Sequence, residues 1–260
     1  MIALDLGDNI SLSMNYVRKL FADSGKLAIL IVLNIIPIVD LVILGYMAKI
    51  FRETPSSESP PKLENYGNLW VDGLKIAVAL VLYMLLPLIL IIVGAVSLFG
   101  GVFSRSFGMP LRLVGGGLGA IVLAAGVILA FVIAVITAMG IVHMVKAGSF
   151  GKAFAFGEIF SVIRKVGWGQ YILWLIVIFV FGAVVASLGS IPIVGWIISM
   201  IVSPIFGVFS SRSAALLYVE AVTPGVSTRE ISGKKFCIAC GAEILKEATY
   251  CPVCGKAQPQ

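Results

Sequence analysis

Three long runs without Asp, Glu, Lys or Arg constrain the fold of this chain more than any other feature. They extend over residues 76–104, 113–145 and 166–211. A helix of about 20 apolar residues crosses the hydrocarbon core of a bilayer. The composition agrees, because 60% of the residues are hydrophobic and only 12% are charged, which is unusual for a soluble domain. We therefore predict an all-α polytopic integral membrane helix bundle of four or five transmembrane helices.

The third run is long enough for two crossings, and Gly189-Ser-Ile-Pro-Ile-Val-Gly195 supplies a turn near its middle. Together the runs predict four spans inside a membrane domain at 1–220, namely 76–99, 118–145, 168–188 and 194–218. Small residues at four-residue spacing, such as Gly115 and Gly119, favour close helix packing and leave a homo-oligomer open.

An apolar segment at 27–50 is broken by Asn34, Pro37 and Asp40, residues that do not suit the middle of a lipid-facing helix. Two readings remain open, a re-entrant hairpin of two half-helices and a kinked full span. Asn34 and Asp40 are the candidate intramembrane polar site. Asp40 could equally cap the N-terminus of a half-helix.

Two further segments have apolar and charged residues at helical spacing. Residues 10–23 predict an amphipathic helix on the membrane surface or on the protein's own loops, and residues 153–166 predict an interfacial helix. His143 falls at the end of a span, where we expect it to face water rather than to react.

Lys and Arg residues set the expected orientation. The loops at 49–75 and 146–165 are richer in them than the intervening loop at 105–112 and the turn at 189–195. Basic loops remain on the cytoplasmic side. We therefore predict a multi-pass protein of the cell membrane whose C-terminus is cytoplasmic, where reduced thiols are expected.

Parts of the membrane domain resemble a known family, the domain of unknown function 4013, which is widespread in archaea and also found in bacteria. The resemblance spans roughly residues 10–220 and rests on three stretches: Asn34 to Tyr46, Tyr66 to Lys75 and Ala153 to Lys165. It implies a polytopic membrane protein without an established activity, so no functional residues carry over.

All four cysteines lie in the tail, as Cys237-x2-Cys240 and Cys251-x2-Cys254. Two such knuckles look like a short zinc ribbon, at 236–256, behind a flexible linker at 221–235. Four thiolates complete a tetrahedral, closed site for one structural Zn2+. A disulfide pair and a rubredoxin-like iron site are the alternatives. Because so short a segment buries little apolar surface, we expect it to fold only with its metal.

The expected partners are the lipid bilayer and a cytoplasmic protein that binds the ribbon. Nucleic acid is not expected, since Glu243 and Glu247 balance the lysines of the tail and no pair of stacking aromatics accompanies them. We predict a non-enzymatic scaffold or regulator. A small-solute or ion transporter or channel, with Asn34, Pro37 and Asp40 along its path, is the alternative. A membrane enzyme ranks third, because the sequence offers no catalytic constellation.

Overall fold

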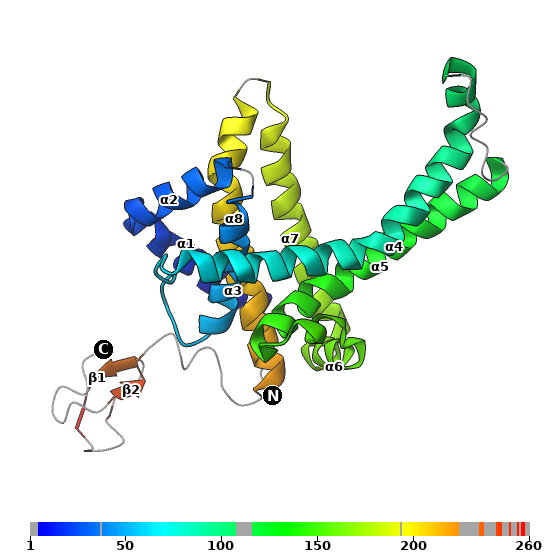
Figure 1. Cartoon of the computed structure of the whole chain (residues 1–260). Coiled ribbons are helices and arrows are strands. Elements are labelled where there is room, and N and C mark those ends of the chain that lie inside the picture. The colour runs from blue at the N-terminus through cyan, green and yellow to red at the C-terminus, as the bar shows by residue number, and fades with distance from the viewer. Residues whose placement is uncertain are drawn as a thin grey trace. The chain divides into compact units, whose positions relative to one another are not determined.

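The computed structural model describes residues 5–36, 38–107, 116–192 and 194–223, and in the tail 234–236, 243–245, 250, 254, 256 and 257. These residues form helices throughout the body and two short strands in the tail (Figure 1). The elements are α1 (Leu6–Ala22), α2 (Ser24–Ile35), α3 (Leu41–Glu53), α4 (Tyr66–Phe107), α5 (Gly116–Ala147), η1 (Phe150–Phe154), α6 (Phe156–Val166), α7 (Trp168–Gly189), α8 (Gly195–Val222), β1 (Lys234–Phe236) and β2 (Glu243–Leu245).

Four of these helices are long and apolar enough to cross a membrane, which confirms the predicted fold class. The spanning parts are Tyr66–Phe99, Gly117–Ala147, Trp168–Gly189 and Gly195–Val222. The first helix begins well before residue 76, where the expected span starts. Its added turns carry polar residues such as Asp72 and Lys75 at helical spacing, so the helix continues beyond its charge-free run.

The chain divides into two compact units. The first comprises Met1–Ile36, Lys49–Glu64 and Val162–Gln260, and the second comprises Pro37–Ala48 and Asn65–Ser161. The boundary near Ile36 coincides with the interruption of the segment 27–50, where α2 ends and α3 starts only at Leu41. With 12 residues, α2 is about 18 Å long, too short to cross the hydrocarbon core.

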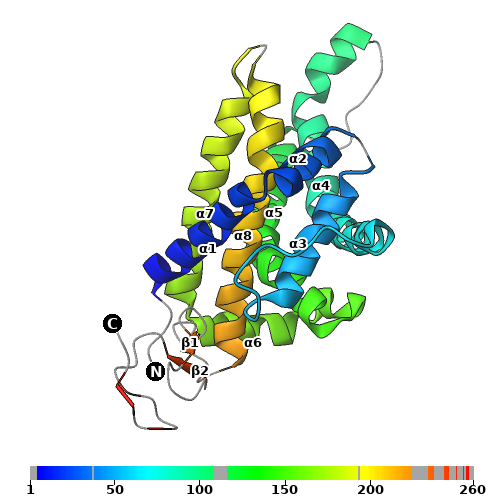
Figure 2. The ribbon, with the colours of Figure 1, turned by 90° about the vertical axis from the view of Figure 1, so that its left-hand side faces the viewer.

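In the first unit, α8 packs against α7, α1 and α2 (Figure 2). The C-terminal half of α8 is buried almost continuously from Val208 to Ala221. By contrast, most side chains of α7 are exposed, including Phe179, as expected of a helix surrounded by lipid. The amphipathic helix α1 buries one face, which includes Tyr16, Val17 and Leu20.

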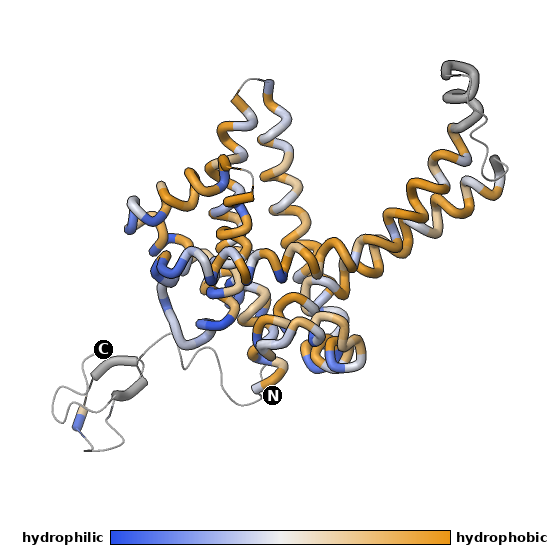
Figure 3. The backbone as a smooth tube through the Cα atoms, in the orientation of Figure 1, coloured by the Kyte–Doolittle hydropathy of each residue, from blue (hydrophilic) through white to orange (hydrophobic). Residues whose placement is uncertain are grey.

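In the second unit, α4 and α5 lie side by side along an apolar contact, which is orange over most of its length in Figure 3. Glycines permit the close approach. A Cβ at Gly126 would lie 2.8 Å from the Ile91 amide nitrogen, and one at Gly119 would lie 2.9 Å from that of Leu98. Small residues therefore bring the two backbones together, as is common in lipid.

The short helices η1 and α6 follow α5 in the chain. The interfacial helix expected at 153–166 is divided, because a 3-10 turn ends at Phe154 and α6 starts at Phe156. Ile159 and Ile163 of α6 are buried, whereas Arg164 is exposed, which is the amphipathic pattern of an interfacial helix.

Candidate functional site

Asn34, predicted to belong to an intramembrane polar site, fills a gap in the hydrogen bonding of α8. Pro204 lies inside α8 and has no N–H to donate to the carbonyl of Met200, one turn earlier. Asn34 Nδ2 donates to this carbonyl oxygen at 3.1 Å and to Ser203 Oγ at 2.9 Å. The half-buried amide thus satisfies a carbonyl that proline leaves unpaired, and it joins α2 to α8.

Asp40, the other member of that predicted site, is exposed immediately before α3. Its backbone carbonyl accepts hydrogen bonds from the amides of Ile43 at 2.8 Å and Leu44 at 3.4 Å, which begin the helix. The two residues belong to different compact units. Asn34 therefore has a defined packing role within the first unit, and Asp40 lies at a helix start in the second.

His143, which we expected to face water, is instead buried near the end of α5, at 8% exposure. Its Nε2 lies 2.9 Å from Glu158 Oε2 on α6, and Lys152 Nζ pairs with the other carboxylate oxygen. Hydrogen bonds from Lys152 and then from His143 hold the pKa of Glu158 below its usual range. The cluster links α5, η1 and α6 at an exposed carboxylate, so it is a tether rather than a buried acid–base pair.

Sequence reasoning missed Arg212, the one cation that the structure describes inside the spanning part of α8. Its side chain is buried at 7% exposure. Nη1 donates to Thr54 Oγ1 at 3.0 Å, and the guanidinium lies over the Tyr16 ring, 4.7 Å from the centroid. The signal was available, since the span predicted at 194–218 contains this charge, and a charged residue at membrane depth is costly and often functional.

Next to Arg212, Ser213 is the centre of a buried hydrogen-bond network that joins three helices. Trp174 Nε1 of α7 donates to Ser213 Oγ at 2.8 Å, and the serine hydroxyl donates to Asn9 Oδ1 of α1. Asn9 Nδ2 in turn donates to the Ser213 carbonyl at 3.1 Å. Each partner in this network satisfies another, so it fixes α1 and α7 on α8.

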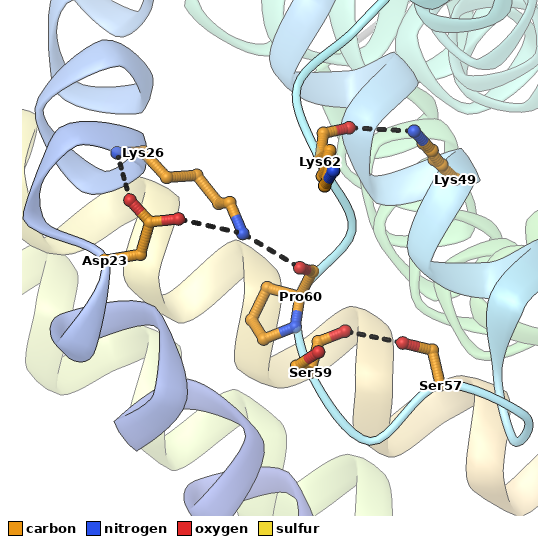
Figure 4. Close-up of polar contacts among 7 residues, drawn as sticks. All are labelled: Asp23, Lys26, Lys49, Ser57, Ser59, Pro60 and Lys62. Carbon is orange, nitrogen blue, oxygen red and sulfur yellow. Dashed lines mark hydrogen bonds and ion pairs between the residues drawn. The ribbon is translucent and has the colours of Figure 1, made fainter.

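The segment between α3 and α4 is held by lysines (Figure 4). Lys26 Nζ donates to the Pro60 carbonyl at 3.0 Å and pairs with Asp23 at 3.3 Å, while Lys49 Nζ donates to the Lys62 carbonyl at 2.8 Å. The Lys26 amide also donates to Asp23, which lowers the pKa of that carboxyl. Lys26 and Lys49, which both belong to the first unit, therefore have a structural role in holding this segment.

In the tail, β1 and β2 pair antiparallel with Phe236 opposite Glu243, and Tyr250 forms a bridge with Ala257. The predicted ligands Cys237, Cys240 and Cys251 lie outside the described residues, whereas Cys254 is described and exposed. In sequence, one cysteine pair lies between the two strands and the other between the two bridge residues. Both Cys-x2-Cys motifs therefore lie on connections closed by backbone pairing, which fits a two-knuckle metal site.

Four long apolar helices followed by a ribbon-like tail define the class: a multi-pass membrane protein in the lipid bilayer with a small appended domain. The chain belongs to the family described as protein of unknown function (DUF4013), whose model matches residues 28–194, and a zinc-ribbon domain matches residues 235–258. The expected resemblance is thereby confirmed. No curated protein and no solved structure matches the chain.

The matched ranges divide the polar residues into two groups. Asn34, Asp40 and His143 lie inside the family match, whereas Tyr16 and Arg212 lie outside both matched ranges. Thr54 and Trp174 of the same buried interior lie inside the family match, so the buried polar interior of the first unit is only partly covered by it.

Proposed function

We propose that this protein is a non-enzymatic membrane scaffold or regulator whose zinc ribbon binds a cytoplasmic protein. One observation carries the proposal. Asn34 is a polar residue that a transport path would use, but its amide instead donates hydrogen bonds to α8. Asp40 is exposed and starts a helix. The ribbon is then the module of the chain best suited to recognise a partner.

In this proposal Cys237, Cys240, Cys251 and Cys254 hold one structural Zn2+. Four thiolates leave no open coordination position for water, so the metal folds the ribbon and does not activate a nucleophile. The ribbon presents a binding surface only in its metal-bound form, because a segment of this size lacks the apolar core to fold alone.

Transport of a small solute or ion is the second candidate. The interruption between α2 and α3 favours it, since broken apolar helices surround the substrate in many transporters. In that case polar residues of this interruption contact the solute and the ribbon regulates the path. The two candidates differ in whether loss of zinc abolishes partner binding or changes a flux.

A crosslinking capture from native membranes tests the docking proposal. The intact chain is compared with Cys237→Ser plus Cys240→Ser, and with Ser227→Ala plus Ser232→Ala as a matched control in the linker. Zinc is measured in all three. We expect the intact chain and the control to hold zinc and to capture the same cytoplasmic protein, and the cysteine variant to lose both. Equal capture by the cysteine variant, or no capture by a zinc-loaded chain, would contradict the proposal.

A further inference from the structure

Among the described residues no carboxylate pairs directly with the guanidinium of Arg212, and Glu58 acts on it only from a longer distance. Among those residues the guanidinium makes one hydrogen bond, from Nη1 to Thr54, and its buried Nε has no partner. The nearby carboxylates are engaged elsewhere, because Glu58 pairs with Lys19 at 3.3 Å and Glu53 with Lys49 at 4.0 Å. A buried charge without a partner is costly, so this side chain is poised to receive an anion.

The free edge of Arg212 has the geometry of a fork. Thr54 takes Nη1, and on the other edge, which Nε forms with Nη2, the buried Nε has no hydrogen-bond partner among the described residues. Two parallel N–H donors of this kind bind two oxygens of a carboxylate or a phosphate. The Tyr16 ring lies beside this guanidinium, with its centroid 4.7 Å from Cζ.

Two hydroxyl donors come from the helix that packs on Arg212. The Tyr16 and Ser13 side chains, 2% and 0% exposed, have hydroxyl oxygens without a hydrogen-bond partner in the described part of the chain. They are three residues apart on α1 and so lie on one face. Burial raises the pKa of Tyr16 above its ordinary value, so its hydroxyl remains a donor.

We propose that Arg212, Tyr16 and Ser13 form a binding site for a phosphate group. Together these side chains offer guanidinium N–H groups and two hydroxyls from two helices, a donor set that suits the several oxygens of a phosphate better than the two oxygens of a carboxylate. Asn9 and Ser213 do not bind the ligand; their mutual hydrogen bonds fix α1 against α8 beside it.

The phosphate comes either from a phospholipid headgroup or from solution, and the chemistry of the site is the same for both. Its position favours the headgroup. The helix α1 exposes Met14 and Phe21 on its outer side, as does an amphipathic helix that lies at the level of the headgroups. Arg212 lies in the C-terminal half of the spanning helix α8, which ends at Val222.

Binding to the full chain, purified and stripped of lipid in detergent, tests this site. Dihexanoyl phosphatidylglycerol and inorganic phosphate are the two probes, each titrated against sodium chloride of the same ionic strength. We expect at least one probe to bind the wild type, and Tyr16→Phe and Ser13→Ala each to bind it about tenfold more weakly, since each loses one hydrogen bond to a charged group. Arg212→Gln should lose binding, whereas Arg164→Gln, at an exposed arginine of α6, should bind as the wild type does.

Binding of the lipid alone assigns the site to a headgroup, and binding of inorganic phosphate assigns it to a free anion; both support the proposal. If Arg212→Gln does not fold, Tyr16→Phe decides, because it keeps the ring and its packing. The proposal is overturned if neither probe binds the wild type beyond the effect of sodium chloride. It is also overturned if both hydroxyl variants retain full affinity, or if Arg164→Gln weakens binding as much as they do. The test does not involve the ribbon, so its result is independent of the docking proposal.

Discussion

The contact between α4 and α5 and the contact between α1 and α8 stabilise helices in opposite ways. Along the first, glycines such as Gly94 and Gly126 let the backbones approach, and apolar side chains fill the rest. Along the second, hydrogen bonds join Asn9, Ser213 and Trp174 inside a buried layer that also contains Arg212.

The difference follows from what surrounds each contact. In lipid, helices gain little from burying apolar groups, so association depends on close van der Waals packing and on hydrogen bonds. The helices α4 and α5 associate through close packing of complementary surfaces, so larger residues in place of the glycines at their contact are poorly tolerated. The pair α1 and α8 uses complementary polar groups, whose loss leaves buried donors and acceptors unpaired.

Filling the α4–α5 contact should have the largest effect. A Cβ at Gly94 would collide with the backbone of Leu123, so Gly94→Leu should cost about 3 kcal/mol of unfolding free energy by forcing the helices apart. Unfolding in mixed detergent micelles measures it. Gly117→Leu is the control, because nothing lies near its Cβ. Equal stability of the two variants would show that close approach is not what holds this pair.

Removing the hydroxyl of Ser213 should cost somewhat less. Ser213→Ala leaves Trp174 Nε1 and Asn9 Oδ1 without their partner in a buried layer, so we expect a loss of about 2 kcal/mol. The same unfolding assay applies. Ser187→Ala, on the exposed side of α7, should change little. A Ser213→Ala variant as stable as the wild type would remove the distinction between the two contacts.

A double-mutant cycle tests the role of Asn34. Asn34→Leu should cost about 1 kcal/mol in the wild-type background, because the Met200 carbonyl loses its donor. Pro204→Ala restores an N–H that can donate to the same carbonyl. The cost of Asn34→Leu should therefore fall in the Pro204→Ala background. Additive effects would mean that the amide serves another purpose, such as contact with a solute.

The smallest effect is expected at Glu158 of the second unit, whose exposed carboxylate contacts Lys152 and His143. Glu158→Gln should lower the melting temperature slightly at neutral pH, and the difference should shrink with added salt. Because the pKa of Glu158 is lowered in the folded state, its contribution is present above the ordinary range of a glutamate and is lost as the pH falls below about 4. Glu64→Gln, an exposed glutamate, is the control. A difference that persists in acid would contradict this assignment.

The spans could be predicted because their signal is local. Some 20 consecutive apolar residues are sufficient to identify a spanning helix, and the four expected helices are present. Their starts could not be fixed as well. At Tyr66 the helix begins among polar residues, where hydropathy no longer indicates helix, so that only the helical spacing of the apolar residues marks it.

The polar interior depended on long-range pairing, which one sequence does not reveal. Asn34 was predicted to belong to a polar site because the sequence does not reveal its partner, the Met200 carbonyl, which is far along the chain. Arg212 carried a local signal, a charge inside a span, that was overlooked. Its neighbours Ser13 and Tyr16 gave none, since a serine and a tyrosine on an amphipathic helix are ordinary until α1 is placed against α8.

Thiol labelling tests the central claim, a zinc-held ribbon on the cytoplasmic side, most directly. All four cysteines lie in the ribbon, so a membrane-impermeant maleimide reports only on that segment. We predict labelling in inside-out vesicles after zinc is chelated, and none in intact cells or in inside-out vesicles that retain zinc. Labelling of intact cells would contradict the orientation, and full labelling without chelation would contradict the zinc site.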